Sequence, residues 1–426
     1  MLRLIIIIMA ALSLFACDGS LNMERATDDV GADARWEADV VSGVDARNPE
    51  ADIHGSNDAR TERDEGGAAD TNVPEGDAGD DCEQITCGQN AECAGGQCLC
   101  RDGFEGDPAQ GCTAPGPCDG VDCANGATCI EGTCHCDGGF DDDGQGGCTP
   151  LSPGDTALRT RDEVCGKWNA DWPIRATTLW TQEPADQCDW GELHPEVHVD
   201  ALRRTSLYRW LVGLGPVTSS EPHRVTTQAC ATTLAARSGG LTHTITADFP
   251  CYTDEAKAGA ASSNLARGIG RPAGTVDLYI GDVGVPSLGH RRWIFNPAMG
   301  VTAFGQRDAY SCMYSFGRGS SDNPDYVAYP APGFFPRQGL IGTWSFSSSR
   351  YGFGAQTDVE ITRVGDGASV PVSNVYIPGG GYGQPVLGWT VNAQDQPLDT
   401  ELEVRITGLS GNLGDTVVYR VTITNC

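Results

Sequence analysis

Basic residues are scarce in this chain of 426 residues, which has 28 Lys and Arg against 58 Asp and Glu and a formal net charge of −30. A nucleic-acid partner is therefore excluded, because binding to phosphates needs a basic face. Long hydrophobic runs are missing too: the longest covers only residues 4–16, and a membrane-spanning helix takes about 20 residues. The chain also has neither the His-Glu-x-x-His nor the Gly-x-Ser-x-Gly pattern of common hydrolases.

The N-terminal run is typical of an export signal. Arg3 precedes the apolar run and small residues end it, which predicts a signal peptide over residues 1–16. The ending Leu14-Phe15-Ala16-Cys17 resembles the bacterial lipobox, which implies that Cys17 is lipidated and becomes the new N-terminus; an ordinary signal with an incidental cysteine is the alternative. We expect an exported lipoprotein, anchored in a membrane by its acyl chains and facing the periplasm or the cell surface.

Residues 17–81 predict a disordered acidic tether. From residue 18 onward this segment carries 19 acidic and 5 basic residues. It cannot bury enough apolar area to offset the entropy cost of ordering, and its self-repulsion keeps it extended.

Nineteen cysteines indicate an oxidising compartment, because a reducing cytosol would keep them as thiols. Twelve of them form the pattern Cys-x4-Cys-x5-Cys-x4-Cys-x-Cys-x11-Cys in residues 82–112 and again in residues 118–148. Modules this short lack a sufficient core and need disulfides to fold. The spacing alone leaves about 15 pairings open in each module.

The spacing, with Gly103-Phe104 and Gly139-Phe140 after the fifth cysteine of each module, resembles EGF-like domains. The resemblance implies the pairs Cys82–Cys93, Cys87–Cys98, Cys100–Cys112, Cys118–Cys129, Cys123–Cys134 and Cys136–Cys148. Calcium-binding members of the family use acidic residues before the first cysteine and further ligands after the third. Asp80, Asp81 and Glu83 supply only part of that set, so we do not expect calcium.

Apart from Cys17, six cysteines remain in the rest of the chain. We expect them to close sequentially, as Cys165–Cys188, Cys230–Cys251 and Cys312–Cys426, with the last pair joining two domains.

Residues 155–325 read as a globular domain with helices before strands. Apolar spacing predicts helices over 199–212 and over 222–237, the second capped by Ser220 with Val225, Ala229, Leu234 and Ala235 facing inward. Pro272 suits the first turn of another helix, and residues 300–306 and 310–316 read as strands. This order suggests α/β/α or α+β layering. Four tryptophans at 168, 172, 180 and 190 either cover a core or offer a stacking platform for glycans.

Four segments of this domain carry a resemblance to the CAP superfamily, also called SCP-like extracellular or pathogenesis-related 1 domains. They are Leu207-Tyr208-Arg209-Trp210, Gly240-Leu241-Thr242-His243, Ser262-Ser263-Asn264-Leu265-Ala266 and Gly289-His290-Arg291-Arg292-Trp293. The resemblance covers about residues 195–317 and implies an α/β/α fold. It also implies a surface cleft with two histidines and two acids, and a lipid, sterol, glycan or peptide as ligand.

The resemblance places His243 and His290 at the two cleft histidines, with core histidines as the alternative. Ser263 stands where the family has glutamate, and Asp282 is the shorter counterpart of the second acid. A zinc site wants three or four ligands, so we expect at most loose zinc at His243 and His290, and negligible hydrolase activity. His194 and His198 are four residues apart, as on a zinc-binding helix, but Pro195 indicates a helix start instead.

Residues 330–426 predict a β-sandwich of Ig-like type. Short strands are expected over 343–348, 357–364, 370–377, 385–391, 401–409 and 416–424. The chain is thus expected to be multidomain. Its leading function is a lipoprotein that presents a ligand-binding CAP-like domain; the alternatives are a metal-assisted hydrolase at His243 and His290, and adhesion to an extracellular protein through the EGF-like and β-sandwich domains.

Overall fold

The structure is a computed structural model that describes Cys82 and residues 85–426, except for residues 125, 138, 146, 151, 153 and 393–397. The expected signal peptide, Cys17 and the tether lie outside the described residues. The described chain is multidomain, mostly β with few helices, and it contains nine disulfides. Within it, every helix is too short or too polar to cross a membrane.

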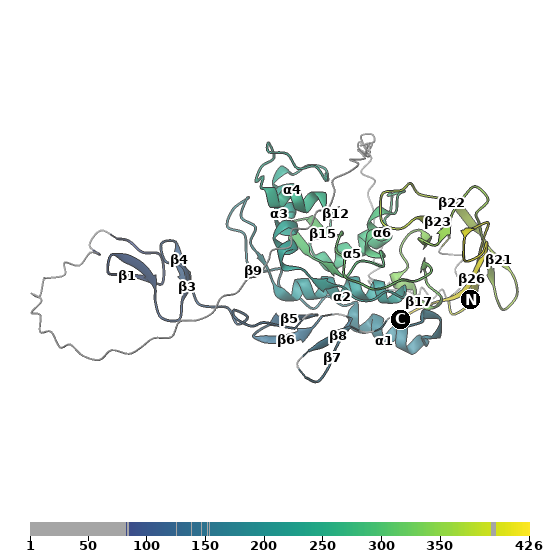
Figure 1. Cartoon of the computed structure of the whole chain (residues 1–426), viewed down its shortest axis with the longest axis horizontal. Coiled ribbons are helices and arrows are strands. Elements are labelled where there is room, and N and C mark those ends of the chain that lie inside the picture. Colours follow the sequence, from purple (N-terminus) through teal and green to yellow (C-terminus); the bar gives the residue numbers. More distant parts are fainter. Residues whose placement is uncertain are drawn as a thin grey trace, which may run out of the picture. The chain divides into compact units, whose positions relative to one another are not determined.

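Two cysteine-rich modules come first, and each consists of two small antiparallel hairpins (Figure 1). The first module has β1 (Ala91–Ala94), β2 (Gln97–Cys100), β3 (Glu105–Asp107) and β4 (Gly111–Thr113). The second has β5 (Ala127–Ile130), β6 (Thr133–Cys136), β7 (Phe140–Asp142) and β8 (Cys148–Pro150). All six disulfide pairs implied for these modules are confirmed.

A helical part follows, comprising residues 155–316. Its helices are η1 (Thr156–Leu158), α1 (Arg161–Asp171), α2 (Pro195–Leu211), α3 (Glu221–Arg237), α4 (Asp254–Ala261), α5 (Pro272–Gly281) and α6 (Gly289–Ile294). The three expected helices are confirmed as α2, α3 and α5. The inward position expected for Val225 is wrong: its side chain is 45% exposed, because the buried face of α3 begins only at Thr227.

A three-stranded antiparallel sheet lies at the centre of the helical part, in the order β12 (Ser263–Arg267), β15 (Tyr310–Tyr314), β14 (Phe304–Arg307). Helices α3 and α4 pack on one face, and α5, with α2 behind it, packs on the other (Figure 1). The expected helix–sheet–helix layering is therefore present. Two short ladders complete this part, β9 (Trp180–Gln182) with β10 (Glu192–Leu193) and β11 (Thr218–Ser219) with β13 (Val301–Thr302).

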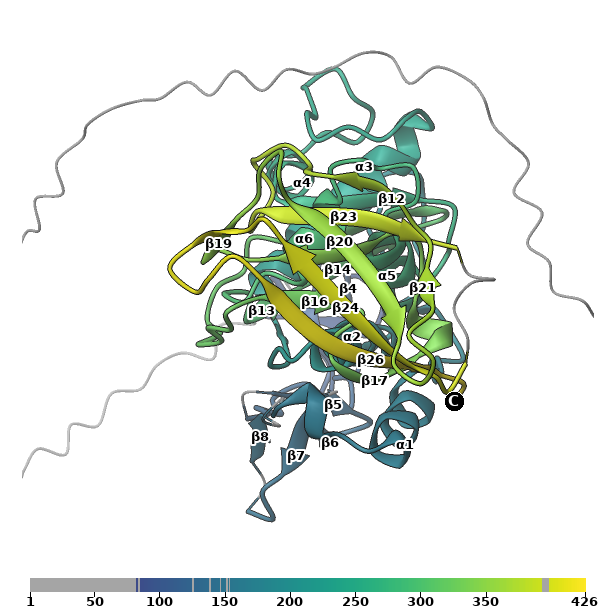
Figure 2. The ribbon, with the colours of Figure 1, turned by 90° about the vertical axis from the view of Figure 1, so that its right-hand side faces the viewer.

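The sandwich part, residues 327–426, contains two sheets. One has the order β16 (Val327–Tyr329), β18 (Trp344–Ser347), β23 (Val386–Val391), β22 (Val372–Tyr376). The other has β17 (Gly333–Pro336), β26 (Val417–Thr424), β24 (Glu401–Thr407), β20 (Asp358–Arg363), β21 (Ser369–Val370). Figure 2 looks onto β20, β24 and β26, which run side by side. A small ladder of β19 (Tyr351–Gly352) and β25 (Ser410–Gly411) and the short helix η2 (Arg337–Gly339) lie between these strands in the chain. All six expected strands are confirmed.

The helical part and the sandwich part share one hydrophobic core. Leu207 and Tyr279 belong to the same buried cluster as Trp344, Trp389 and Val404. The stacked rings of Trp168 and Trp172, 4.1 Å apart, also pack in this cluster, so these two tryptophans cover a core.

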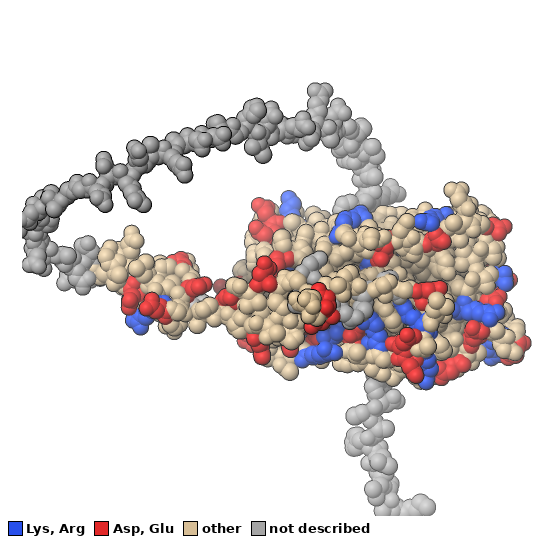
Figure 3. Space-filling view, turned by 60° about the horizontal axis from the view of Figure 1, so that its bottom comes forward, with Lys and Arg blue, Asp and Glu red and all other residues tan. Residues whose placement is uncertain are grey.

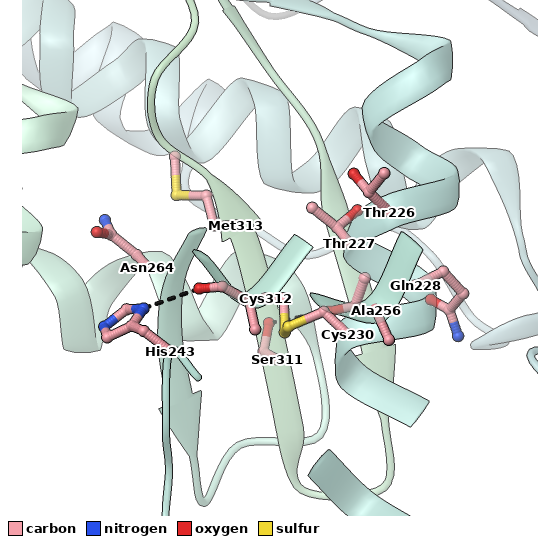
Figure 4. The surroundings of a disulfide bond; sticks show 12 residues. Thr226, Thr227, Gln228, Cys230, His243, Ala256, Asn264, Ser311, Cys312 and Met313 are labelled. Carbon is pink, nitrogen blue, oxygen red and sulfur yellow. Dashed lines mark hydrogen bonds between the residues drawn. A yellow bond between two sulfur atoms is a disulfide. The ribbon is translucent and has the colours of Figure 1, made fainter. Parts of the chain in front are cut away.

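The sequential pairing expected for the last six cysteines is wrong. The disulfides are Cys165–Cys426, Cys188–Cys251 and Cys230–Cys312. Packing between elements decides them, because α3 lies on the central strand β15 and brings Cys230 next to Cys312 (Figure 4). In the same way α1 packs beside β17, which pairs with the last strand, and so Cys165 meets the end of the chain.

Candidate functional site

The expected cleft residues His290 and Asp282 meet at the start of α6. The imidazole Nδ1 of His290 donates a hydrogen bond of 2.6 Å to Oδ1 of Asp282. The Asp282 side chain is fully buried, whereas the His290 side chain is 26% exposed. With Nδ1 protonated, Nε2 of a neutral ring is an acceptor. The pair therefore combines a hidden carboxylate with an imidazole that solvent reaches.

Asp282 is held from two sides. It follows α5 in a left-handed conformation, with φ of 46°, which Asp tolerates better than most residues. Its second oxygen, Oδ2, accepts the backbone N–H of Arg291 at 3.0 Å. Both carboxylate oxygens thus have partners on α6, and the ring of His290 is fixed in direction.

A second layer of contacts links this pair to the sheet. The side-chain amide of Asn264 donates to the His290 carbonyl at 3.1 Å, and the Tyr279 hydroxyl donates to the Asn264 carbonyl at 3.0 Å. The rings of Tyr279 and His290 lie 5.3 Å apart. Burial raises the pKa of Tyr279, so its hydroxyl keeps its proton and stays a donor.

Ser263, the residue expected in place of the family glutamate, is buried on β12, opposite Tyr314 of β15. Among the described residues its hydroxyl has no hydrogen-bond partner. A neutral hydroxyl is a poor ligand for a divalent cation and a poor base. Ser263 therefore brings neither charge nor basicity to this position.

Within the described residues, His243 is not hydrogen-bonded to Asp282 or His290. Its ring is exposed in the loop after α3, and its Nδ1 donates to the Ala260 carbonyl at 2.8 Å (Figure 4). In the part of the chain that the structure describes, no three His, Cys, Asp or Glu side chains come close enough to hold a metal ion. Both oxygens of Asp282 are bonded on α6, so Asp282 does not complete a three-ligand set with the two histidines, and loose zinc at His243 and His290 stays a prediction.

Arg291 and Arg292, which follow His290, have a structural role that was not predicted from the sequence. Arg291 is fully buried, and its guanidinium donates to the carbonyls of Ile280 at 2.6 Å and Ile341 at 3.1 Å. Arg292 donates to the carbonyls of Gln384 and Gly379, at 2.9 and 2.8 Å. The His-Arg-Arg block therefore fastens α6 to the sandwich part, and no local pattern could have identified these distant partners.

On the face shown in Figure 3, acidic and basic side chains are interspersed. Residues 155–426 have a net charge of only about −6, far less acidic than the whole chain. Comparisons with models of protein families, with curated proteins and with solved structures found no match. The site must therefore be interpreted from its own geometry.

Proposed function

We propose that this chain is an exported lipoprotein, anchored through Cys17, that presents a CAP-like ligand-binding domain on two EGF-like modules. The nine disulfides support export, because such bonds persist in oxidising compartments. Ligand binding rests on the Asp282–His290 pair, whose buried carboxylate aims a partly exposed imidazole. An aimed ring on a rigid helix is a preorganised hydrogen-bonding group.

Binding fits this site better than hydrolysis does. The metal-assisted alternative needs at least one ligand besides His243 and His290, and among the described residues no three His, Cys, Asp or Glu side chains come close enough to hold a metal ion. Ser263 cannot activate a water molecule in place of glutamate. Lipids, sterols, glycans and peptides remain the ligand classes that the CAP resemblance implies.

A matched pair of histidine variants tests the ligand site. The disulfide-intact full chain, His290→Gln and His243→Gln are each incubated with a total lipid extract, a glycan mixture and a peptide mixture. Bound molecules are then quantified by mass spectrometry. We expect His290→Gln to lose about tenfold of the bound component, because about one hydrogen bond is removed. His243→Gln should retain it.

Equal retention by both variants would reject the proposed site. If no small molecule is retained but a secreted protein is captured by the chain and by both variants alike, adhesion through the modules replaces ligand binding as the function.

The anchor has its own test. Cys17→Ser should move the protein from the membrane fraction to the soluble fraction and remove its acyl label, because stable anchoring takes the acyl chains. A variant that stays in the membrane with its label would show that Cys17 is not the anchor.

A further inference from the structure

A pocket beside Asp282 is a second candidate site. An open pocket of about 360 Å³ is lined by Asp282 and Pro286 from the segment between α5 and α6, and by Thr343, Asn374, Tyr376 and Thr390 from the sandwich part. His290 does not line it. This volume falls within the range of about 300–1,000 Å³ that is common for small-molecule sites.

The sandwich wall of the pocket is shaped by an irregularity in β22. The register between β22 and β23 shifts between Ser373 and Tyr376. Within this bulge Asn374 adopts a left-handed conformation with φ of 51°. Bulges and left-handed residues other than glycine often occur at functional sites, where they redirect a side chain. Here the redirected strand supplies Asn374 and Tyr376 to the same pocket.

A glycine makes room for the ring of Tyr376. Gly388 of β23 is its partner across the ladder. A Cβ atom at Gly388 would lie 2.8 Å from Cε1 of Tyr376. The tyrosine ring thus lies directly against the strand, and this close contact requires a residue without a side chain at position 388.

The chemistry of the lining points to an uncharged ligand. It includes Thr390 and Asn374, and Tyr376 and Thr343, whose side chains are hydrogen-bonded to each other, but no Lys, Arg or His. The carboxylate of Asp282 is fully buried, accepts hydrogen bonds from His290 and Arg291 of α6, and is attracted by the charge of the buried Arg291 guanidinium. Neither an anion nor a cation would therefore find an uncompensated partner. Hydroxyl and amide groups can donate and accept, and so they match a ligand that does both.

We infer that this pocket binds a neutral, hydroxyl-rich molecule of the sugar class. The helical part and the sandwich part each contribute a wall. The pocket shares Asp282 with the ligand site at His290, but Asn374, Tyr376 and Thr390 belong to the pocket alone and can be changed without touching that pair.

The test uses neutral and charged disaccharides, among which N,N′-diacetylchitobiose and chitobiose are a matched pair. The disulfide-intact full chain is titrated with N,N′-diacetylchitobiose, cellobiose and maltose, which are neutral. It is also titrated with chitobiose, the cationic deacetylated counterpart of the first, and with anionic digalacturonic acid. Binding is measured by saturation-transfer NMR and calorimetry. We expect at least one neutral disaccharide to bind, and both charged ones to bind at least about tenfold more weakly.

Three variants locate the binding. Thr390→Val removes a hydroxyl at constant shape, Asn374→Gly removes the amide and keeps the left-handed backbone, and Gly388→Ala displaces the ring of Tyr376. Each should weaken the neutral sugar about three- to tenfold, the effect of losing about one hydrogen bond. Thr422→Val on β26, outside the pocket, is the control and should bind like the parent.

The inference is overturned if none of the three neutral disaccharides binds. It is also overturned if a charged counterpart binds as tightly, or if both Thr390→Val and Asn374→Gly leave the affinity unchanged. The pocket variants are also tested in the mixture assay. If they lose sugar binding but retain the component that His290→Gln loses, the two sites are separate.

Discussion

Arg291 shows how much of the structure can depend on one buried charge. Its guanidinium donates to the carbonyls of Ile280, Gly281 and Ile341 and to the Ser345 hydroxyl. Replacing it with Met would leave these acceptors buried without a donor. We expect Arg291→Met to lower the free energy of unfolding by about 3–5 kcal/mol, measured by urea unfolding with the disulfides intact.

Lysine is the informative second variant at this position. Arg291→Lys keeps the charge but cannot donate in a fork to several carbonyls, so it should recover only part of the loss. Arg420→Met provides the control, because Arg420 is 53% exposed in its ion pairs and should change stability by about 0.5 kcal/mol or less. Equal losses of unfolding free energy in Arg291→Met and Arg420→Met would contradict the conclusion that Arg291 fastens α6 to the sandwich part.

His198 predicts a pH dependence of stability. It is buried on α2, its Nδ1 has no partner among the described residues, and burial lowers its pKa well below the ordinary 6.5. Below about pH 6.5, His198 binds a proton in the unfolded chain but stays neutral in the native chain. Stability should therefore fall as the pH drops, with a slope of up to about 1.4 kcal/mol per pH unit from this group.

The comparison with His198→Leu isolates this contribution. Unfolding free energies measured between about pH 7 and pH 5 should fall more steeply in the parent than in the variant. His135→Gln, an exposed histidine of the second module, should keep the parental slope because His198 is intact. Parallel curves for the parent and His198→Leu would show that His198 does not remain neutral in the native state.

At the scale of elements, α3 and α4 are held together by close backbone contact. A Cβ atom at Gly259 of α4 would lie 2.0 Å from the Thr226 carbonyl oxygen of α3. A backbone atom cannot move aside as a side chain can, so Gly259→Ala should destabilise the protein by about 1–3 kcal/mol. Thermal unfolding followed by circular dichroism would measure it.

A second helical glycine gives the matched control. Gly166 of α1 has open space around its Cβ position, so Gly166→Ala should stabilise by about 0.5–1 kcal/mol through helix propensity. Shifts of the same sign in both variants would show that the α3–α4 contact is looser than described.

The sequence predicted elements well where a local rule decided them. Pro195 and Pro272 stand in the first turns of α2 and α5, and alternating apolar residues gave strands such as β24 and β26. The site was predicted only in part. His290 and Asp282 share a short stretch of chain and do meet, whereas the position of His243 depends on where a loop of α3 lies. Asn374 and Thr390 line a pocket with Asp282 through packing alone, and no local pattern reports such packing.

The same contrast holds for the whole molecule. In the modules, the cysteines pair as the EGF-like resemblance implies, at sequence separations of only 11 or 12 residues. Cys165 and Cys426 are 261 residues apart. Chain order carries no information on which helix meets which strand, so the sequential rule failed at this scale.

Two features predict that residues 155–426 unfold cooperatively: the Cys165–Cys426 disulfide and the shared hydrophobic core. Arg161 of α1 donates to the hydroxyl of Thr424 and the carbonyl of Asn425, next to the Cys165–Cys426 disulfide. Buried residues of the helical part and of both sandwich sheets form one cluster, so neither part can unfold without exposing the core of the other. Calorimetry should therefore show one transition for residues 155–426, with equal calorimetric and van't Hoff enthalpies.

The double change Cys165→Ser and Cys426→Ser should lower the free energy of unfolding by about 2–5 kcal/mol, since it releases a long loop in the unfolded chain. Because the core remains shared, the transition of this variant should stay single. Two resolved transitions in the parent would mean that the helical and sandwich parts are independent domains, whereas two in the variant alone would mean that the disulfide, and not the core, couples them.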